Sequence, residues 1–174
     1  IIKRPALLIS GVINWLKTAA MKTRILGFKK AIIKPSKKPS ITPSINSSSS
    51  ISTLKFDIRE DLPFESNSVD ACYSHMLYCM ALTQKDLDKL NSEIHRILKP
   101  GGINIYTVRN TDDGDYKKGI HRGEDLYEND GFIVHFFSKD KVNKLSKGFK
   151  VLDIEKFEEG KFPRKLFIVK NIKI

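Results

Sequence analysis

The first fifty residues of this 174-residue chain contain no aspartate or glutamate, although the whole chain has 20 of them. Ten of the 31 lysines and arginines lie in the same segment, which therefore carries +10 of the formal net charge of +11. Residues 51–174 are almost neutral. The basic character of the chain belongs to its N-terminal segment, and this segment needs its own interpretation.

Long apolar runs and cysteines are also scarce. No stretch of 18 apolar residues occurs, so a membrane-spanning helix is excluded. Two cysteines, Cys72 and Cys79, are too few for a disulfide framework and predict reduced thiols in a cytoplasmic protein. The histidines and cysteines do not follow zinc-ligand spacing, so no metal site is predicted. The chain begins with Ile1, which suggests a trimmed or truncated sequence.

Residues 1–50 are predicted to form a basic, Ser/Pro-rich extension or linker, and residues 51–174 a separate domain. Leu8, Val12, Trp15 and Leu16 have helical spacing, whereas residues 35–50 combine three prolines with a run of serines and cannot form a packed core. A basic segment without acids suits an anionic membrane, nucleic-acid phosphates, a targeting role or a solvated extension. The solvated extension is the simplest of these, and it makes nucleic-acid or membrane contact through residues 1–38 the weaker expectation.

The following hundred residues alternate between strand and helix patterns. Alternating apolar residues predict a strand over residues 54–58, and a second strand is expected over residues 69–73. Thr83 is a favourable N-cap for an amphipathic helix, which the Lys99-Pro100-Gly101-Gly102 turn ends before a strand over residues 103–108.

The C-terminal part continues the alternation. A β-rich run covers residues 132–137, and Ser138 is placed to cap a short helix. Residues 149–154 and 166–169 predict two strands that pair antiparallel. Strands that alternate with helices indicate an α/β sheet with parallel members.

Four motifs in this order resemble the class I S-adenosylmethionine-dependent methyltransferases, in their small-molecule-type domain. They are Phe56-Asp57-Ile58, Leu62-Pro63-Phe64, Ser68-Val69-Asp70 and Leu98-Lys99-Pro100-Gly101-Gly102. The resemblance covers about residues 53–172, the C-terminal two-thirds of such a domain. It implies an α/β fold, an incomplete Rossmann-like sheet that ends in a C-terminal antiparallel strand pair.

The sequence departs from this family where the cofactor loop is expected. The first hundred residues contain only Gly11 and Gly27, so they lack the Gly-rich turn that follows the family's first strand. The acid that holds the ribose hydroxyls is also missing, because no acid precedes Asp57. Either residues 1–50 supply replacement strands or the domain is truncated, and truncation is the favoured interpretation. An edge left open in this way invites a homodimer.

The resemblance assigns candidate residues to the cofactor. Asp57 and Ile58 correspond to the positions that contact the adenine, and Tyr73 and Ser74 follow the strand where cofactor and substrate meet in the family. His75, next in the chain, is a candidate general base for a nitrogen or oxygen acceptor.

A second set of candidates lies between the fifth strand of the family and the C-terminal strands. His121, Arg122 and Glu124 occupy a long connection that suits a substrate loop, where they would orient a polar or anionic acceptor. His121 is the second candidate base. Arg109 and Arg164 are further candidate substrate-binding residues.

The leading hypothesis is therefore an S-adenosylmethionine-dependent methyltransferase that acts on a small-molecule acceptor, chiefly by proximity and orientation. The missing glycines predict weak or absent activity of this chain alone. The alternative is a non-catalytic, methyltransferase-like module that binds a partner or dimerises. A third hypothesis makes residues 1–38 a salt-sensitive tether to nucleic acid or membrane.

Overall fold

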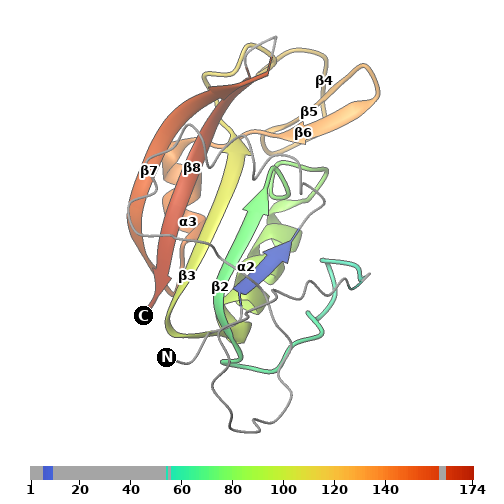
Figure 1. The fold of residues 1–174 in the computed structure, drawn as a ribbon. Coiled ribbons are helices and arrows are strands. Elements are labelled where there is room, and N and C mark those ends of the chain that lie inside the picture. The colour runs from blue at the N-terminus through green and yellow to red at the C-terminus, as the bar shows by residue number, and fades with distance from the viewer. Residues whose placement is uncertain (1–5, 10–53, 55, 161–163) are drawn as a thin grey trace, which may run out of the picture.

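The computed structural model describes residues 6–9, 54, 56–160 and 164–174 of the chain. Among them, five strands form one sheet in the order β1-β2-β3-β8-β7 (Figure 1). β1 runs parallel to β2 and β2 parallel to β3, whereas β8 and β7 are antiparallel. The strands are β1 (Ala6–Ile9), β2 (Val69–His75), β3 (Leu98–Arg109), β7 (Phe149–Glu159) and β8 (Arg164–Lys173).

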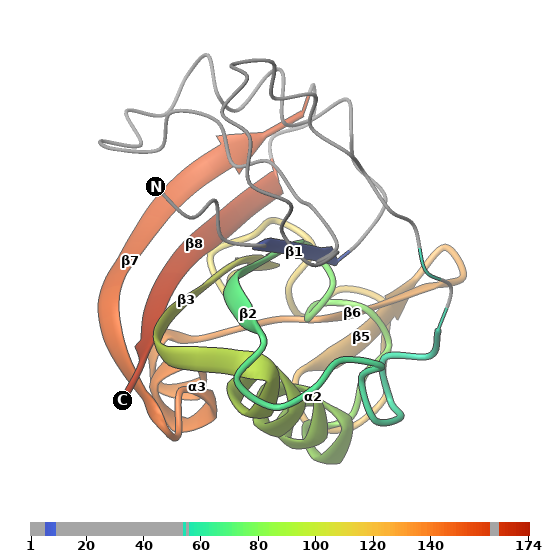
Figure 2. The same cartoon turned by 60° about the horizontal axis from the view of Figure 1, so that its bottom comes forward.

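Two helices, α2 (Gln84–Ile97) and α3 (Lys139–Leu145), cover one face of this sheet (Figure 2). Thr83 and Asp86 form a capping box at the start of α2, and Ser138 caps α3. The apolar face of α2 is fully buried, and each of its leucines and isoleucines contributes about 1.5–3 kcal/mol of hydrophobic free energy; this face consists of Leu87, Leu90, Ile94 and Ile97. Both predicted caps are confirmed.

The α/β architecture is also confirmed, including the antiparallel pair at the C-terminus. β7 and β8 form a long hairpin whose tip lies at the carboxyl end of β3, because Leu166 pairs with Arg109. A separate three-stranded sheet lies beyond the carboxyl ends of β2 and β3 (Figure 1). It consists of β4 (Ile120–His121), β5 (Leu126–Asn129) and β6 (Phe132–His135).

The predicted strand over residues 54–58 does not form. Asp57 instead begins a turn, in which its main-chain oxygen accepts from Glu60 N (3.2 Å) and its carboxylate accepts from Arg59 N (2.9 Å). Alternating apolar residues favour a strand only when a neighbouring strand supplies the hydrogen bonds. Here the carboxylate of Asp57 binds a main-chain N–H group that a strand would need for pairing. Phe56 and Ile58 therefore pack on the core from an irregular segment.

The N-terminal segment differs from its prediction as well. Leu8 lies in β1 and not in a helix, since Ala6–Ile9 pair with residues 71–74 of β2 and supply a replacement strand on that side of the sheet. The predicted helix beyond Leu8 and the linker over residues 35–50 lie outside the described residues. Within the described part of the chain, no helix has the length and apolar character needed to cross a membrane.

Candidate functional site

Two parallel strands, β2 and β3, end at the same edge of the sheet, and this edge carries a group of polar side chains. Tyr73, Ser74 and His75 form the end of β2, and His75 lies opposite Thr107 in the register with β3. Open α/β sheets bind ligands outside the carboxyl ends of their parallel strands. The structure therefore places three of the candidate residues where a ligand is expected.

The imidazole of His75 is held at both nitrogens. Its Nδ1 lies 2.7 Å from Thr107 Oγ1, and its Nε2 lies 3.3 Å from Glu159 Oε2. Thr107 Oγ1 also accepts a hydrogen bond from Met76 N at 3.0 Å. The side chain of His75 is only 8% exposed, so its ring is fixed by contacts from two other strands.

The electrostatics of this edge keep both aromatic groups of β2 neutral. Burial lowers the pKa of His75, against the opposing effect of the Glu159 carboxylate and with a further lowering by the charge of Arg164. Burial and the nearby charge of Glu159 raise the pKa of the Tyr73 phenol. At neutral pH His75 is therefore an uncharged imidazole and Tyr73 retains its proton.

Ser74 offers a polar atom that the described residues leave unused. The residue is fully buried, and its Oγ has no hydrogen-bond partner among the described residues. A buried hydroxyl without a partner costs about 1–3 kcal/mol of folding free energy. A ligand that donates to or accepts from Ser74 would remove this cost.

Asp57 and Ile58 lie in the turn described above, on a segment that α2 holds in place. The Asp57 carboxylate binds the Arg59 side chain through contacts of 2.6–3.2 Å, and these bonds lower the pKa of Asp57 to about 2. Farther along, Arg96 donates to the main-chain oxygens of Leu62 (2.9 Å) and Phe64 (2.8 Å). Ile58 is half-buried against the core, whereas the carboxylate of Asp57 is exposed.

Arg109, a predicted substrate-binding residue, belongs to an ion-pair network at the end of β3. Its buried guanidinium binds Asp113 and Asp115, with 2.6 Å between its Nη2 and Asp115 Oδ2. Its Cζ also lies 5.2 Å from the centre of the Phe136 ring. These contacts fix the loop after β3 and occupy Nε and Nη2 of Arg109.

The structure places His121, Arg122 and Glu124 around the three-stranded sheet. His121 is exposed, stacks on Tyr127 with 4.9 Å between ring centres, and contacts the main-chain oxygen of Glu124. Arg122 binds Glu128, and Glu124 accepts from the main-chain nitrogen of Gln84 at the start of α2. Arg164, by contrast, is exposed at the start of β8, opposite Glu159 in the hairpin.

Sequence reasoning missed two residues of the His75 group. Thr107 was detectable, because neighbouring parallel strands end at the same edge of the sheet and Thr107 lies near the end of β3. Glu159 carries no local signal, since its approach to His75 depends on the return of a hairpin that begins 74 residues after His75 in the chain. Its role becomes visible only in three dimensions.

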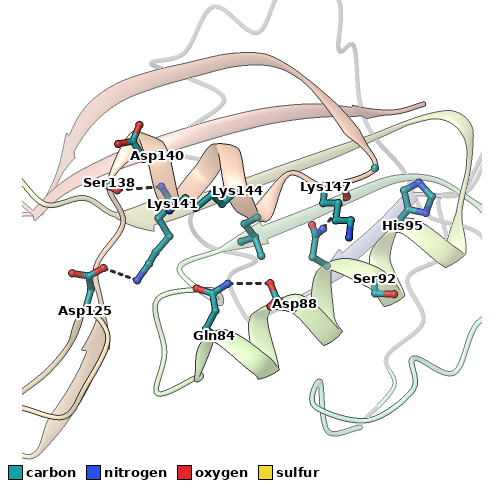
Figure 3. Close-up of a pocket in the computed structure, with 13 residues that line it drawn as sticks. Gln84, Asp88, Ser92, His95, Asp125, Ser138, Asp140, Lys141, Lys144 and Lys147 are labelled. Carbon is teal, nitrogen blue, oxygen red and sulfur yellow. Dashed lines mark hydrogen bonds and ion pairs between the residues drawn. The ribbon is translucent and has the colours of Figure 1, made fainter.

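A second polar region lies between α2 and α3, where a cavity of about 1030 Å³ opens (Figure 3). Lys141 at its edge binds Asp125 (2.6 Å) and lies 2.6 Å from Nε2 of the buried His135. His135 Nδ1 donates to the main-chain oxygen of Leu82, so Nε2 accepts from Lys141. These partners are all satisfied locally, and the cavity lining includes none of the His75 group.

No group of three potential metal ligands gathers among the described residues. A family model described as a methyltransferase domain matches residues 30–106. This range contains all four motifs named above, as well as Tyr73, Ser74 and His75 at the end of β2. No protein of curated function matches the sequence.

Solved structures share the fold. A methyltransferase from Methanosarcina mazei, described as dependent on S-adenosylmethionine, has a TM-score of 0.57 at 17% identity, over 68% of this chain and 65% of its own. The 1,6-didemethyltoxoflavin N1-methyltransferase of Burkholderia thailandensis was solved with bound 1,6-didemethyltoxoflavin and S-adenosylhomocysteine. It has a TM-score of 0.52 at 16% identity, over 67% of this chain and 48% of its own. A Pyrococcus horikoshii protein has a TM-score of 0.52 at 20% identity, over 68% of this chain and 57% of its own. The chain thus spans about half to two-thirds of the length of these proteins.

Proposed function

We propose that this chain, which matches a methyltransferase-domain model over residues 30–106 and shares the fold of solved methyltransferases, binds S-adenosylmethionine and transfers the methyl group to a small-molecule acceptor. The observation that carries the proposal is the polar group at the carboxyl ends of β2 and β3, where His75 contacts Thr107 of β3 and Glu159 at the end of β7. It occupies the edge at which this type of sheet binds ligands.

The described residues fit the nucleoside part of this cofactor. The Asp57 carboxylate accepts hydrogen bonds, and its ion pair with Arg59 is exposed, so it is readily exchanged for an exocyclic amine. The unpartnered Ser74 Oγ offers a second polar contact. The described residues before Gly101 contain no glycine, so they offer no counterpart of the Gly-rich loop for the methionine part of the cofactor.

Bound S-adenosylmethionine supplies an electrophilic methyl group, and the residues of the chain supply orientation. The hydrogen bond with Thr107 and the 3.3 Å contact with the Glu159 carboxylate hold the ring of His75, so the end of β2 presents a fixed surface to the acceptor. A fixed surface favours in-line displacement, because it holds the acceptor at attack distance from the methyl group before the reaction. His75 is proposed as an acceptor-side residue ahead of His121, which is exposed on the other sheet.

The test is calorimetric titration of the purified chain with S-adenosylmethionine and S-adenosylhomocysteine. We expect binding that weakens at least tenfold in Asp57→Ala, since one charge-assisted hydrogen bond contributes about 1.5–3 kcal/mol. Asp61→Ala is the matched control, because Asp61 is a more exposed acid on the same segment and binds Lys89 at the surface. Equal loss in both variants, or no binding to the folded wild-type chain, would reject the proposal.

A non-catalytic module is the second candidate, and the scarcity of glycine before residue 100 favours it. Such a module would give no heat with either cofactor form while remaining folded. Retained secondary structure by circular dichroism, together with concentration-dependent association, would then identify a binding or dimerising role.

We also propose that the reaction takes place in the cytoplasm. Cys72 and Cys79 are both buried free thiols, and burial raises their pKa values to about 12 and about 11, respectively. Thiols of this kind are unreactive and suit a reducing compartment.

A further inference from the structure

A histidine of β6, His135, joins the three-stranded sheet to the connection between β2 and α2. Its main-chain nitrogen donates to Cys79 O at 3.0 Å, and its ring Nδ1 lies 2.7 Å from Leu82 O. Both oxygens belong to residues 76–83, which begin directly after His75 at the candidate site. The side chain of His135 is fully buried, so these contacts are shielded from solvent. His135 therefore fixes a segment that follows the ligand-binding edge of the sheet.

The ring of His135 also contacts α3 through Lys141. A main-chain oxygen only accepts, so Nδ1 carries the proton that Leu82 O receives. In the neutral ring Nε2 is bare, and the Lys141 ammonium donates to it at 2.6 Å. Lys141 also binds Asp125 Oδ2 at 2.6 Å (Figure 3), and the Tyr116 hydroxyl donates to Asp125 Oδ1 at 3.1 Å. We refer to His135, Lys141 and Asp125 as the His135 cluster.

The charged groups that act on His135 come from two elements. Lys141 approaches from α3, and Glu124 and Asp125 approach from the residues between β4 and β5. Glu124 Oε2 lies 4.0 Å from Nε2, which is too long for a hydrogen bond, and it accepts from the first main-chain nitrogen of α2. In the β2–α2 connection the thiol of Cys79 is neutral, because burial raises its pKa to about 11. A second ring proton would therefore meet the Lys141 ammonium and find no acceptor at hydrogen-bond distance among the described residues.

The folded structure favours the neutral form of His135. Burial lowers the pKa of His135 below its ordinary value of 6.5, and the charge of Lys141 lowers it further. The bond to Leu82 O and the carboxylates of Glu124 and Asp125 have the opposite effect but are outweighed. The cluster thus contributes its full stability above pH 6.5, and this contribution decreases as the pH falls through the lower, folded-state pKa.

We propose that His135 is a positioning residue, which in its neutral form holds the β2–α2 connection beside the candidate site and releases it when Nε2 is protonated. This role is independent of the proposed methyl transfer, since it concerns any ligand bound at this edge. The release is local, because Tyr78 stacks on Tyr106 in the core with 4.3 Å between ring centres and keeps the first part of the connection in place. Residues 79–82 are the part that opens, and mild acid thereby loosens one side of the ligand-binding edge.

The first part of the test is ¹⁵N NMR of the histidine rings in the full wild-type chain over a pH series. We expect the neutral His135 ring to carry its proton on Nδ1 and to have a pKa below 6.5. A proton on Nε2 at neutral pH, or a pKa of 6.5 or higher, overturns the proposal. This measurement needs no variant, so it does not depend on whether a substituted chain folds.

The second part is amide hydrogen exchange, corrected for the intrinsic effect of pH. From pH 7.5 to pH 5, exchange over residues 79–82 should rise about tenfold, because each unit of pKa shift changes the opening equilibrium tenfold. Exchange in β3 and β8 should stay constant. His135→Gln should abolish the pH dependence, whereas His95→Gln, a half-buried position of α2 outside the His135 cluster, should retain it. Exchange that is independent of pH in the wild-type chain, or equally dependent on pH in the two variants, overturns the proposal.

The third part changes the cation that faces the ring. Lys141→Met removes both the charge that lowers the His135 pKa and the donor to Nε2, so the pH midpoint of opening should rise by about half a unit or more. Lys144→Met is the matched control, because Lys144 is an exposed lysine of the same helix outside the His135 cluster. Its midpoint should equal that of the wild-type chain. A midpoint that stays unchanged in Lys141→Met, or that rises equally in both variants, overturns the assigned role of His135.

Discussion

Arg109 shows how a charged residue at a ligand-binding edge can stabilise the structure around it. Its guanidinium connects the end of β3 to the following loop, and Asp113 also accepts from Lys165 N at 2.8 Å on β8. The pair therefore links β3, the loop after it and the start of β8. Because the hairpin tip carries Glu159, this buried ion pair supports the geometry of the candidate site.

Acid should weaken this link. Burial raises the pKa of Asp113, but the hydrogen bonds from Arg109 and two main-chain nitrogens outweigh it and leave the pKa below its ordinary value of 3.8. The bound Asp113 carboxylate therefore contributes stability above that value, and the contribution disappears as the pH falls through the lower, folded-state pKa. Asp113→Asn should lower the free energy of unfolding at pH 7 by about 3 kcal/mol, and by less at pH 2.5.

Urea denaturation of the two proteins at both pH values measures this difference. Asp112→Asn is the matched control, because its carboxylate binds Lys156 at the surface and belongs to no buried network. A pH-independent effect of Asp113→Asn would mean that the ionised form of Asp113 does not contribute to stability.

At the scale of elements, α2 positions the segment that carries the cofactor candidate Asp57. Glu93, which is buried, accepts from Leu62 N (2.8 Å), and Arg96 binds both Glu93 and the main chain of the segment. These bonds compensate for the absence of strand pairing over residues 54–58. The helix thus replaces a neighbouring strand as the support of this segment.

Arg96→Met should release the segment while it preserves the aliphatic part of the side chain. We expect a loss of about 1–3 kcal/mol of stability, since Glu93 would remain buried without its cation. Amide hydrogen exchange should increase over residues 56–68 and remain unchanged in β7 and β8. Lys85→Met, an exposed position on the same helix, is the control, and equal exchange in the two variants would contradict the supporting role of Arg96.

Local chemistry explains which elements were predictable. The caps Thr83 and Ser138 are decided within three residues of sequence, and the prediction was correct at both. Asp130-Gly131, with positive φ at both residues, is an equally local signal for the β5–β6 hairpin and was overlooked. The strand over residues 54–58 was wrong because its formation depends on a distant partner, which no local pattern reports. The contact between Glu159 and His75 has the same origin.

At the scale of the whole molecule, β1 determines which edge of the sheet is exposed. Its four residues pair with Ala71–Ser74 and cover the side of β2 opposite β3. At the other edge, β7 carries a register shift between Val151 and Asp153 and several charged residues, which protect an edge strand from pairing with another chain. Dimerisation through the sheet therefore depends on whether β1 remains in place.

Deletion of residues 1–9 removes β1 and should increase self-association of the chain. The free edge of β2 would expose main-chain donors and acceptors that a second copy of the chain can satisfy by pairing in the same way. We expect the deleted protein to associate with increasing concentration in size-exclusion chromatography with light scattering, and the full chain to associate less. A variant with Lys3 and Arg4 replaced by Gln separates lost charge from lost pairing, because it retains β1. Identical masses for the deleted and full-length proteins at all concentrations would show that β1 does not protect the edge.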